Sequence, residues 1–462
     1  MTGNEDISLR HHDSEQDASF NSLDADTRAR QREAGRKRAL VLAGSAILQL
    51  PIWGFAMAYG VFQEYFSSSA WTLAGSRDVT GIIGTTSNGV MYLSMPFLFA
   101  LFTRGGRWAR HRQSAALCGA ALSCFSFLAS SFSTHVWHLV ATQGVLAALG
   151  CALVYSPTTL SLGEWYSESS DSSNRAVAYG VVLSCKNIVG STCPFLLRAL
   201  LDRYGFRVAL RVWTALVAGT SIPAVMFLIP TPPASVGASA AHRGRKIPWH
   251  FLRHRTFWVH VVAIVFQSSG YGIPQTYLNT YAKEVTLLSQ TSATLLLTLF
   301  NIPGIVSSSF FGYLSDNKRF PMSATTVTAI SAVSSALAAF FFWGLTSQGS
   351  MALLVLFSVT FGFFAGGYSA TWGGVINEME REAAQRNEAI DTGMLYGLLN
   401  GARGVGYVSG GLAGVPLLNA GTVGTSFGYG TSYGPLIIFT GLSSVLGGWG
   451  LLWKWKRLLR LA

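Results

Sequence analysis

Long apolar stretches separated by short polar connections dominate the pattern along the chain. Twelve stretches reach about 20 residues, the length at which an α-helix crosses a bilayer. They lie at 39–62, 81–102, 114–132, 137–161, 176–197, 208–229, 257–279, 291–314, 322–343, 351–376, 392–417 and 434–453. Six precede and six follow a polar divider at 230–256. The pattern predicts an all-α membrane protein with twelve transmembrane helices in two six-helix bundles.

The polar segments set the expected domain boundaries. We expect a disordered cytoplasmic tail over 1–38, a six-helix bundle over 39–229, a cytoplasmic linker over 230–256, a second bundle over 257–455 and a short cytoplasmic tail over 456–462. Composition supports a membrane protein, because half of the 462 residues are apolar and only 12% are charged.

The net charge of +12 reflects topology rather than nucleic-acid binding. Most lysines and arginines of the bundles occur in the even-numbered connections and in the linker between the two bundles. Because such residues are enriched on the cytoplasmic side, this bias predicts that both termini are cytoplasmic. We expect a multi-pass protein of the plasma membrane, with the lipid bilayer as its surroundings and no nucleic-acid partner.

Two basic residues interrupt apolar stretches near their midpoints. Lys186 and Arg403 each follow a Tyr-Gly pair at the same spacing, and they occupy equivalent stretches of the two halves. A charge at the centre of a membrane helix costs about 2.5 to 3.5 kcal/mol on insertion scales. Every carboxylate outside the first 38 residues falls in a connection or at the end of a stretch. The pair therefore indicates an anionic ligand, although pairing with backbone carbonyls and close helix packing at the neighbouring glycines remain alternatives.

Several motifs carry a family resemblance. The eighth stretch is followed by Gly312-x-x-x-Asp316-x-Lys318-Arg319, and the first stretch ends in the segment 53–63, WGFAMAYGVFQ. With twelve spans and a basic linker, the chain resembles the major facilitator superfamily, and 53–63, 138–144 and 175–180 resemble its fungal monocarboxylate-transporter-like branch. The resemblance implies a substrate site between the bundles and a gate at Gly312, Asp316, Lys318 and Arg319. It implies a monomer that needs no cofactor.

The resemblance is incomplete at the positions that couple transport to protons. The proton-coupled carriers have a lysine in span 1 and an aspartate-arginine pair in span 8, where this chain has Met57 and offers only Gly304 and Ser308. Proton symport is therefore a family expectation that cannot be transferred residue by residue. Lys186 is the alternative carrier of a proton, because a desolvated lysine can lose its charge.

Other polar and aromatic residues near span midpoints are candidate substrate ligands. The family arrangement favours spans 1, 4, 7 and 10, and three asparagines lie near the other midpoints. The candidates are Tyr59, Gln143, Gln275, Trp372, Asn187, Asn301 and Asn400. Ordinary core packing or lipid contact is the competing interpretation for each of them.

The function expected from these features is secondary active transport of a small organic anion, a monocarboxylate or carboxylated metabolite, with protons as a candidate coupling ion. One alternative is an exporter of a secondary metabolite or toxin, and another is a non-transporting nutrient sensor. We do not expect an enzyme, because the sequence contains no metal-ligand cluster and no nucleophile-base spacing.

Overall fold

The computed structural model describes residues 28–29, 32–68, 77–103, 108–167, 172–228, 249–316, 322–388, 390–424 and 426–459. Most of the predicted N-terminal tail and of the linker lie outside these residues. So do Lys318 and Arg319 of the predicted gate and the side chain of Asp316. The described helices extend into both predicted tails, since the first continuous helix begins at Arg32 and α18 spans Gly450–Leu459.

Helices make up nearly all of the described chain, and these residues contain no β-strand. The main helices of the first half are α2 (Gln49–Met57), α3 (Tyr59–Ser68), α4 (Gly81–Phe102), α5 (Arg112–Ser130), α6 (Val136–Leu139), α7 (Ala147–Ser167) and α8 (Ser172–Pro223). Those of the second half are α10 (Arg255–Glu284), α11 (Gln290–Asn301), α12 (Pro303–Asp316), α13 (Ala324–Leu337), α14 (Met351–Gly367), α15 (Trp372–Gln385), α16 (Thr392–Asn419), α17 (Gly434–Gly447) and α18.

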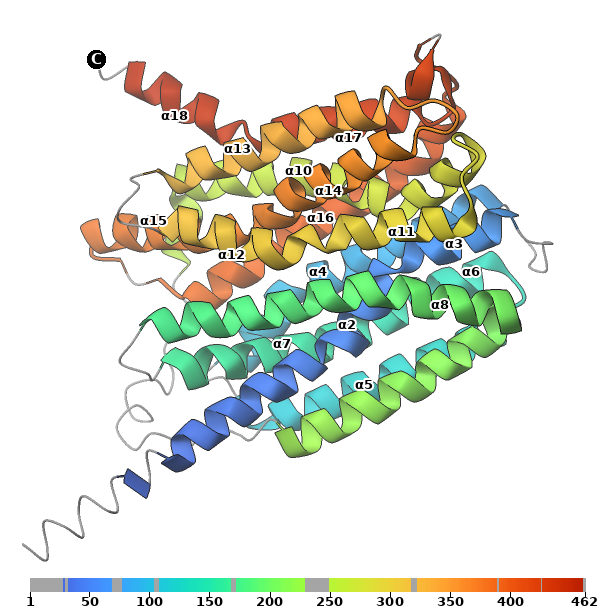
Figure 1. Cartoon of the computed structure of the whole chain (residues 1–462). Helices are drawn as coiled ribbons and strands as arrows, with labels where there is room; N and C mark the ends of the chain where they lie inside the picture. The colour runs from blue at the N-terminus through green and yellow to red at the C-terminus, as the bar shows by residue number, and fades with distance from the viewer. Residues whose placement is uncertain are drawn as a thin grey trace, which may run out of the picture.

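Helix α8 doubles back within its length. Gly205 has φ 74° and ψ 173°, a backbone conformation that glycine adopts without steric cost. Figure 1 shows the two arms of α8 running back from this bend toward the same end of the molecule. The bend falls in the segment 198–207, which the sequence predicts as a loop.

Eight helical segments in the described ranges are long and apolar enough to cross a membrane, fewer than the twelve predicted. The segment at 178–226 is a single one of these eight although it contains the bend of α8. Helices α4, α10 and α16 are not among the eight, and all three carry buried polar side chains such as Asn88, Gln275 and Arg403. Polar residues on an interior face lower the mean hydropathy of a helix without exposing it to water.

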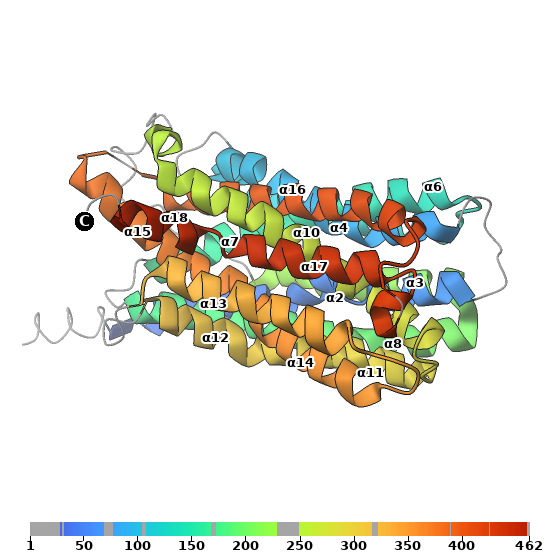
Figure 2. The same cartoon turned by 90° about the horizontal axis from the view of Figure 1, so that it is seen from above.

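The helices run side by side in two groups that follow the order of the chain. Figure 1 shows the helices of the first half, blue to green, mostly below those of the second half, yellow to red. Seen from above, the helices remain roughly parallel, and α18 lies at the same end of the molecule as α15 (Figure 2). Helix α16 of the second half packs against α4 of the first half and against α10. The three long helices that are not among the eight apolar segments therefore pack together where the halves meet.

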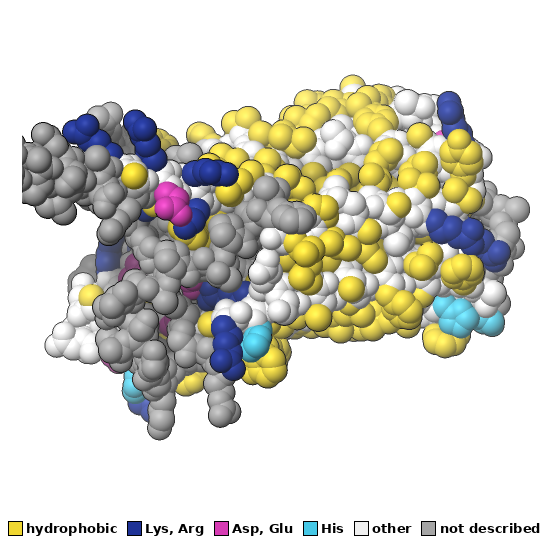
Figure 3. Space-filling view, turned by 90° about the horizontal axis from the view of Figure 1, so that it is seen from below, with side chains coloured by type: hydrophobic (Ala, Val, Ile, Leu, Met, Phe, Trp, Pro, Cys, Tyr) yellow, Lys and Arg dark blue, Asp and Glu magenta, His cyan; other side chains and the backbone are white. Residues whose placement is uncertain are grey.

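The side-chain distribution on the surface suits a lipid environment. Hydrophobic side chains spread over the middle of the face in Figure 3, whereas lysines and arginines gather toward its two ends. Large apolar residues such as Phe97, Phe125 and Leu412 are more than half exposed. An apolar belt between two charged ends is the arrangement expected of a bilayer-spanning bundle.

Candidate functional site

A cavity lies between the two halves and is lined by helices of both. The lining residues are Trp53, Met57, Asn88, Tyr92, Leu183, Lys186, Asn187, Tyr271, Gln275, Ser308, Gly366, Ser369, Arg403 and Tyr407. Of the predicted ligands, Lys186, Asn187, Gln275 and Arg403 line this cavity together. Their role as substrate ligands remains a prediction.

Lys186 reaches the cavity from α8 in the first half. Its Nζ lies 3.9 Å from the centre of the Trp53 ring, and its side chain is half-buried. This cation–π contact is favourable, by about 0.5 to 2 kcal/mol depending on desolvation. Three N–H groups of the ammonium can still donate to a ligand in the cavity.

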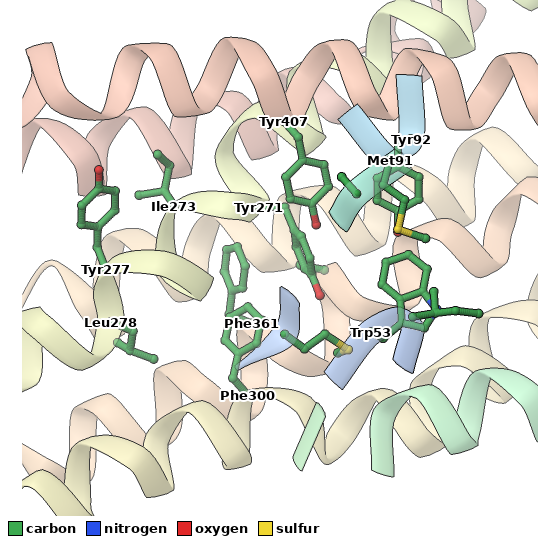
Figure 4. Close-up of a cluster of buried hydrophobic side chains, with 14 of the residues drawn as sticks. Trp53, Met91, Tyr92, Tyr271, Ile273, Tyr277, Leu278, Phe300, Phe361 and Tyr407 are labelled. Carbon is green, nitrogen blue, oxygen red and sulfur yellow. The ribbon is translucent and has the colours of Figure 1, made fainter. Parts of the chain in front are cut away.

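Arg403 enters the same cavity from α16 and is 7% exposed. Its Cζ lies 5.0 Å from the ring centre of Tyr92, 5.4 Å from Tyr271, 5.7 Å from Tyr407 and 5.8 Å from Trp372. Tyr92 and Tyr407 stack with ring centres 5.6 Å apart. Figure 4 shows Tyr407 and Tyr271 close together, with Tyr92 and Trp53 beside them. Aromatic side chains therefore form much of the wall around the guanidinium.

Neither Lys186 nor Arg403 forms an ion pair within the part of the chain that the structure describes. The Nε of Arg403 is buried and has no hydrogen-bond partner there. Burying a charge costs several kcal/mol, more than one ring contact returns. Two cations that face one cavity also repel each other. An anion between them would offset both costs.

Three helices present their cavity residues one turn apart. Asn88 and Tyr92 on α4 are four residues apart, and the same spacing relates Tyr271 to Gln275 on α10 and Arg403 to Tyr407 on α16. Residues at this spacing share one helix face. Tyr92 and Tyr407 were not predicted from the sequence, although their spacing from Asn88 and Arg403 is the signal that would have identified them.

The structure places the remaining predicted ligands away from the cavity lining. The Tyr59 hydroxyl donates to the Thr80 carbonyl at 2.6 Å, and the Asn400 amide donates to the Tyr396 carbonyl of its own helix at 2.8 Å. Gln143 is fully buried, and neither atom of its amide has a partner among the described residues. The Trp372 ring centre lies 5.8 Å from the Cζ atom of Arg403, and the ring packs on Tyr396. In the predicted gate, a side chain at Gly312 would meet nothing within 4 Å.

Asn301 connects the two halves at a proline. Its Nδ2 donates to the Gly190 carbonyl at 3.0 Å and to the Leu297 carbonyl at 2.9 Å. In an α-helix the Gly190 carbonyl would accept from residue 194, but Pro194 has no N–H. Asn301 thus supplies a hydrogen bond that α8 cannot make for itself. These two hydrogen bonds favour a role in packing between the halves, and a role as a substrate ligand stays a prediction.

Replacing Asn301 with leucine is expected to lower stability without raising KM. The substitution leaves the Gly190 carbonyl without its donor, at a cost of about 1 to 3 kcal/mol. The midpoint of thermal unfolding of the purified protein measures its stability. The KM for substrate uptake by the same protein in proteoliposomes measures substrate binding. Asn400→Leu is the matched control with a smaller expected loss, because Tyr396 keeps its carbonyl partner within the helix. Unchanged stability with a raised KM would instead make Asn301 a ligand.

Comparisons with known proteins agree with this architecture. Residues 41–411 match the model of the Major Facilitator Superfamily. The MFS-type transporter pynF of Aspergillus niger is 22% identical over 394 residues, which cover 84% of this chain and 82% of the relative. Monocarboxylate transporter 13 of Rattus norvegicus is 27% identical over 375 residues, 79% of this chain and 78% of the relative.

A third relative, an MFS-type transporter of Gibberella moniliformis, is 26% identical over 316 residues, 67% of this chain and 70% of the relative. The predicted likeness to fungal transporters and to monocarboxylate transporters is therefore confirmed. Because the family model matches most of its length, the chain belongs to the Major Facilitator Superfamily and is a membrane protein of a transporter family.

Proposed function

We propose that the protein is a secondary active transporter of a small organic anion, held between Lys186 and Arg403 and moved by alternating access. The observation that carries the proposal is the pair of cations, one from each half, that line one cavity without an ion-pair partner in the described part of the chain. A ligand bound by both would bridge the two halves. Substrate sites between halves are a general feature of such transporters.

A carboxylate is the anion that suits these two side chains. The guanidinium of Arg403 can donate two parallel hydrogen bonds to the two carboxylate oxygens, and Lys186 adds a compact positive charge. Tyr92, Tyr271 and Trp53 provide apolar wall beside the cations. We infer a monocarboxylate with an apolar body, because its charge would meet the cations and its body would meet the rings. The cavity in this structure, about 30 Å³, has room for only a few waters, so such a substrate would bind when the halves move apart. Relatives named monocarboxylate transporters support this class of substrate.

The twelve-span topology forms part of the proposal. The two arms of α8 on either side of Gly205 count as two spans, and α4, α10 and α16 add three to the remaining apolar segments. We propose that both ends of the chain are cytoplasmic, as the lysine and arginine bias favours, and that the protein acts as a monomer in the plasma membrane. Protons are the proposed coupling ion, with Lys186 as the candidate carrier.

The proposal predicts that the protein distinguishes a carboxylate from its neutral amide. Benzoate and benzamide have nearly the same shape, but only benzoate offers a charge to Lys186 and Arg403. Proteoliposomes of the purified protein are expected to take up benzoate at least tenfold faster than benzamide, since charge-assisted hydrogen bonds contribute about 1.5 to 3 kcal/mol. Initial rates are corrected for passive entry with protein-free liposomes. A panel of aliphatic and aromatic carboxylates extends the comparison.

Two outcomes would contradict the anion proposal. Equal transport of the acid and the amide would remove the need for a cationic site. Transport of neutral compounds alone would favour the exporter alternative. Efflux from preloaded vesicles, measured in parallel, separates import from export.

A further inference from the structure

A second charged cluster lies on α3, α8 and α10, beyond the residues that line the cavity. Glu64 on α3 accepts a hydrogen bond from Lys283 of α10 at 2.7 Å and forms a close ion pair with Arg198 of α8. Arg198 also binds Asp202 of its own helix at 2.9 Å. Glu64 is 1% exposed, whereas the Lys283 side chain is 30% exposed and that of Asp202 45%. A buried carboxylate is therefore held between two cations.

The cluster connects the two halves of the molecule. Glu64 and Arg198 belong to the first half and Lys283 to the second. Among ion pairs between described side chains, Glu64–Lys283 is the one that joins the halves. The others lie within one half, such as Arg112–Glu164 in the first and His254–Glu388 in the second. Separation of α3 from α10 would have to break this pair.

Arg198 and Lys283 lie further along α8 and α10, which line the cavity, and Glu64 lies on α3, which directly follows the cavity helix α2. Glu64 comes seven residues after Met57, Arg198 twelve after Lys186, and Lys283 eight after Gln275. Eight residues of α-helix span about 12 Å. Between cavity and cluster, a Cβ atom at Gly60 would lie 2.7 Å from the Gln275 carbonyl oxygen, so α3 and α10 are in backbone contact there. In Figure 1 this end of α3 lies away from α18 and the C-terminus.

We propose that the Glu64–Lys283 pair is a latch that holds this end of the cavity closed and releases when the halves move apart. Arg198 makes the release inexpensive in free energy. When Lys283 leaves, Glu64 keeps Arg198 as its counter-charge, so no buried charge is left alone. Lys283 is the most exposed of the three and passes into water. The cluster thus combines one fixed ion pair with one that can open.

A cysteine reporter on α10 tests the latch. Asn279 is 1% exposed and lies one turn before Lys283 on the way from Gln275. In the full chain, with the five native cysteines replaced by serine, Asn279→Cys is labelled in intact cells with a membrane-impermeant maleimide. Adding Lys283→Ala is expected to raise the labelling rate about fivefold, the effect of losing an ion pair worth about 1 kcal/mol. Lys283→Arg restores the pair and is expected to return the rate to its original value.

The controls separate the latch from a general change in charge or folding. Arg203→Ala removes an exposed positive charge near the Gly205 bend and is expected to leave the labelling rate unchanged. Gln63→Cys on the facing helix α3 serves as a second reporter and is expected to respond in the same way. A Lys283→Ala rate equal to that of the parent and of Arg203→Ala at both reporters would overturn the latch. The measurement uses no substrate, so its result is independent of the anion proposal. It rests on the proposed topology, which a Leu287→Cys variant, 66% exposed at the same end, tests in the same cells.

Discussion

Replacing Arg403 with methionine is expected to reduce carboxylate uptake by about two orders of magnitude. Methionine preserves much of the length and apolar volume of the side chain but removes the positive charge and every N–H donor. Two charge-assisted hydrogen bonds to a carboxylate contribute about 3 kcal/mol together, and 1.4 kcal/mol corresponds to a factor of ten. Initial uptake of a radiolabelled carboxylate, normalised to the amount of protein at the membrane, measures the effect.

Two further variants define what Arg403 contributes. Arg403→Lys keeps the charge but loses the planar fork, so an intermediate loss of about tenfold is expected. Arg207→Met removes an exposed arginine near the Gly205 bend and is expected to leave uptake unchanged. If Arg403→Met keeps uptake within about threefold of the wild type while it folds normally, Arg403 is not a substrate ligand.

Introducing a single methyl group at Gly404 is expected to weaken both stability and transport. A Cβ atom there would lie 2.5 Å from the Leu93 amide nitrogen and 2.9 Å from the Gly89 carbonyl oxygen. Both are backbone atoms of α4, so α4 and α16 would have to separate. Overpacking of this kind costs about 1 to 3 kcal/mol. The same shift would move Arg403 away from Tyr92, so uptake should fall together with the midpoint of thermal unfolding.

A second glycine in a long helix provides the control. A Cβ atom at Gly219 of α8 would meet nothing within 4 Å, so Gly219→Ala is expected to be neutral or slightly stabilising. Thermal unfolding of both variants in the same detergent gives the comparison. Equal midpoints for Gly404→Ala and Gly219→Ala would mean that α4 and α16 do not pack as closely as the structure shows.

Much of the helical architecture follows from the apolar pattern. The predicted stretch at 81–102 coincides with α4 (Gly81–Phe102), and 434–453 covers α17 and the start of α18. The first helix was predicted too short, because a run of basic residues before position 39 reads as a solvated tail yet continues the helix from Arg32. The apolar pattern also places a break at 198–207, where the structure has the bend of α8, but it predicts a loop there, whereas the chain stays helical on both sides of Gly205.

Only the charged residues of the site could be singled out with a physical reason from the sequence. Lys186 and Arg403 are conspicuous in the sequence because charged residues are rare in apolar stretches. The face that a polar residue presents depends on how the helices pack. Tyr59 and Asn301 therefore ranked as candidate ligands, although both bind backbone carbonyls. Glu64 lies just past the end of an apolar stretch, and its two ion-pair partners could not be inferred because they come from distant parts of the chain.

Direct binding of a carboxylate to the purified protein tests the central claim, that Lys186 and Arg403 hold one anion together. Titration calorimetry would compare the wild type, Lys186→Met, Arg403→Met and the double variant. We predict that each single variant binds the carboxylate at least tenfold more weakly than the wild type. The binding free energy lost in the double variant should differ from the sum of the losses in the two single variants, because both residues contact the same ligand. Wild-type affinity in the double variant would contradict the proposal that this cavity binds an anion.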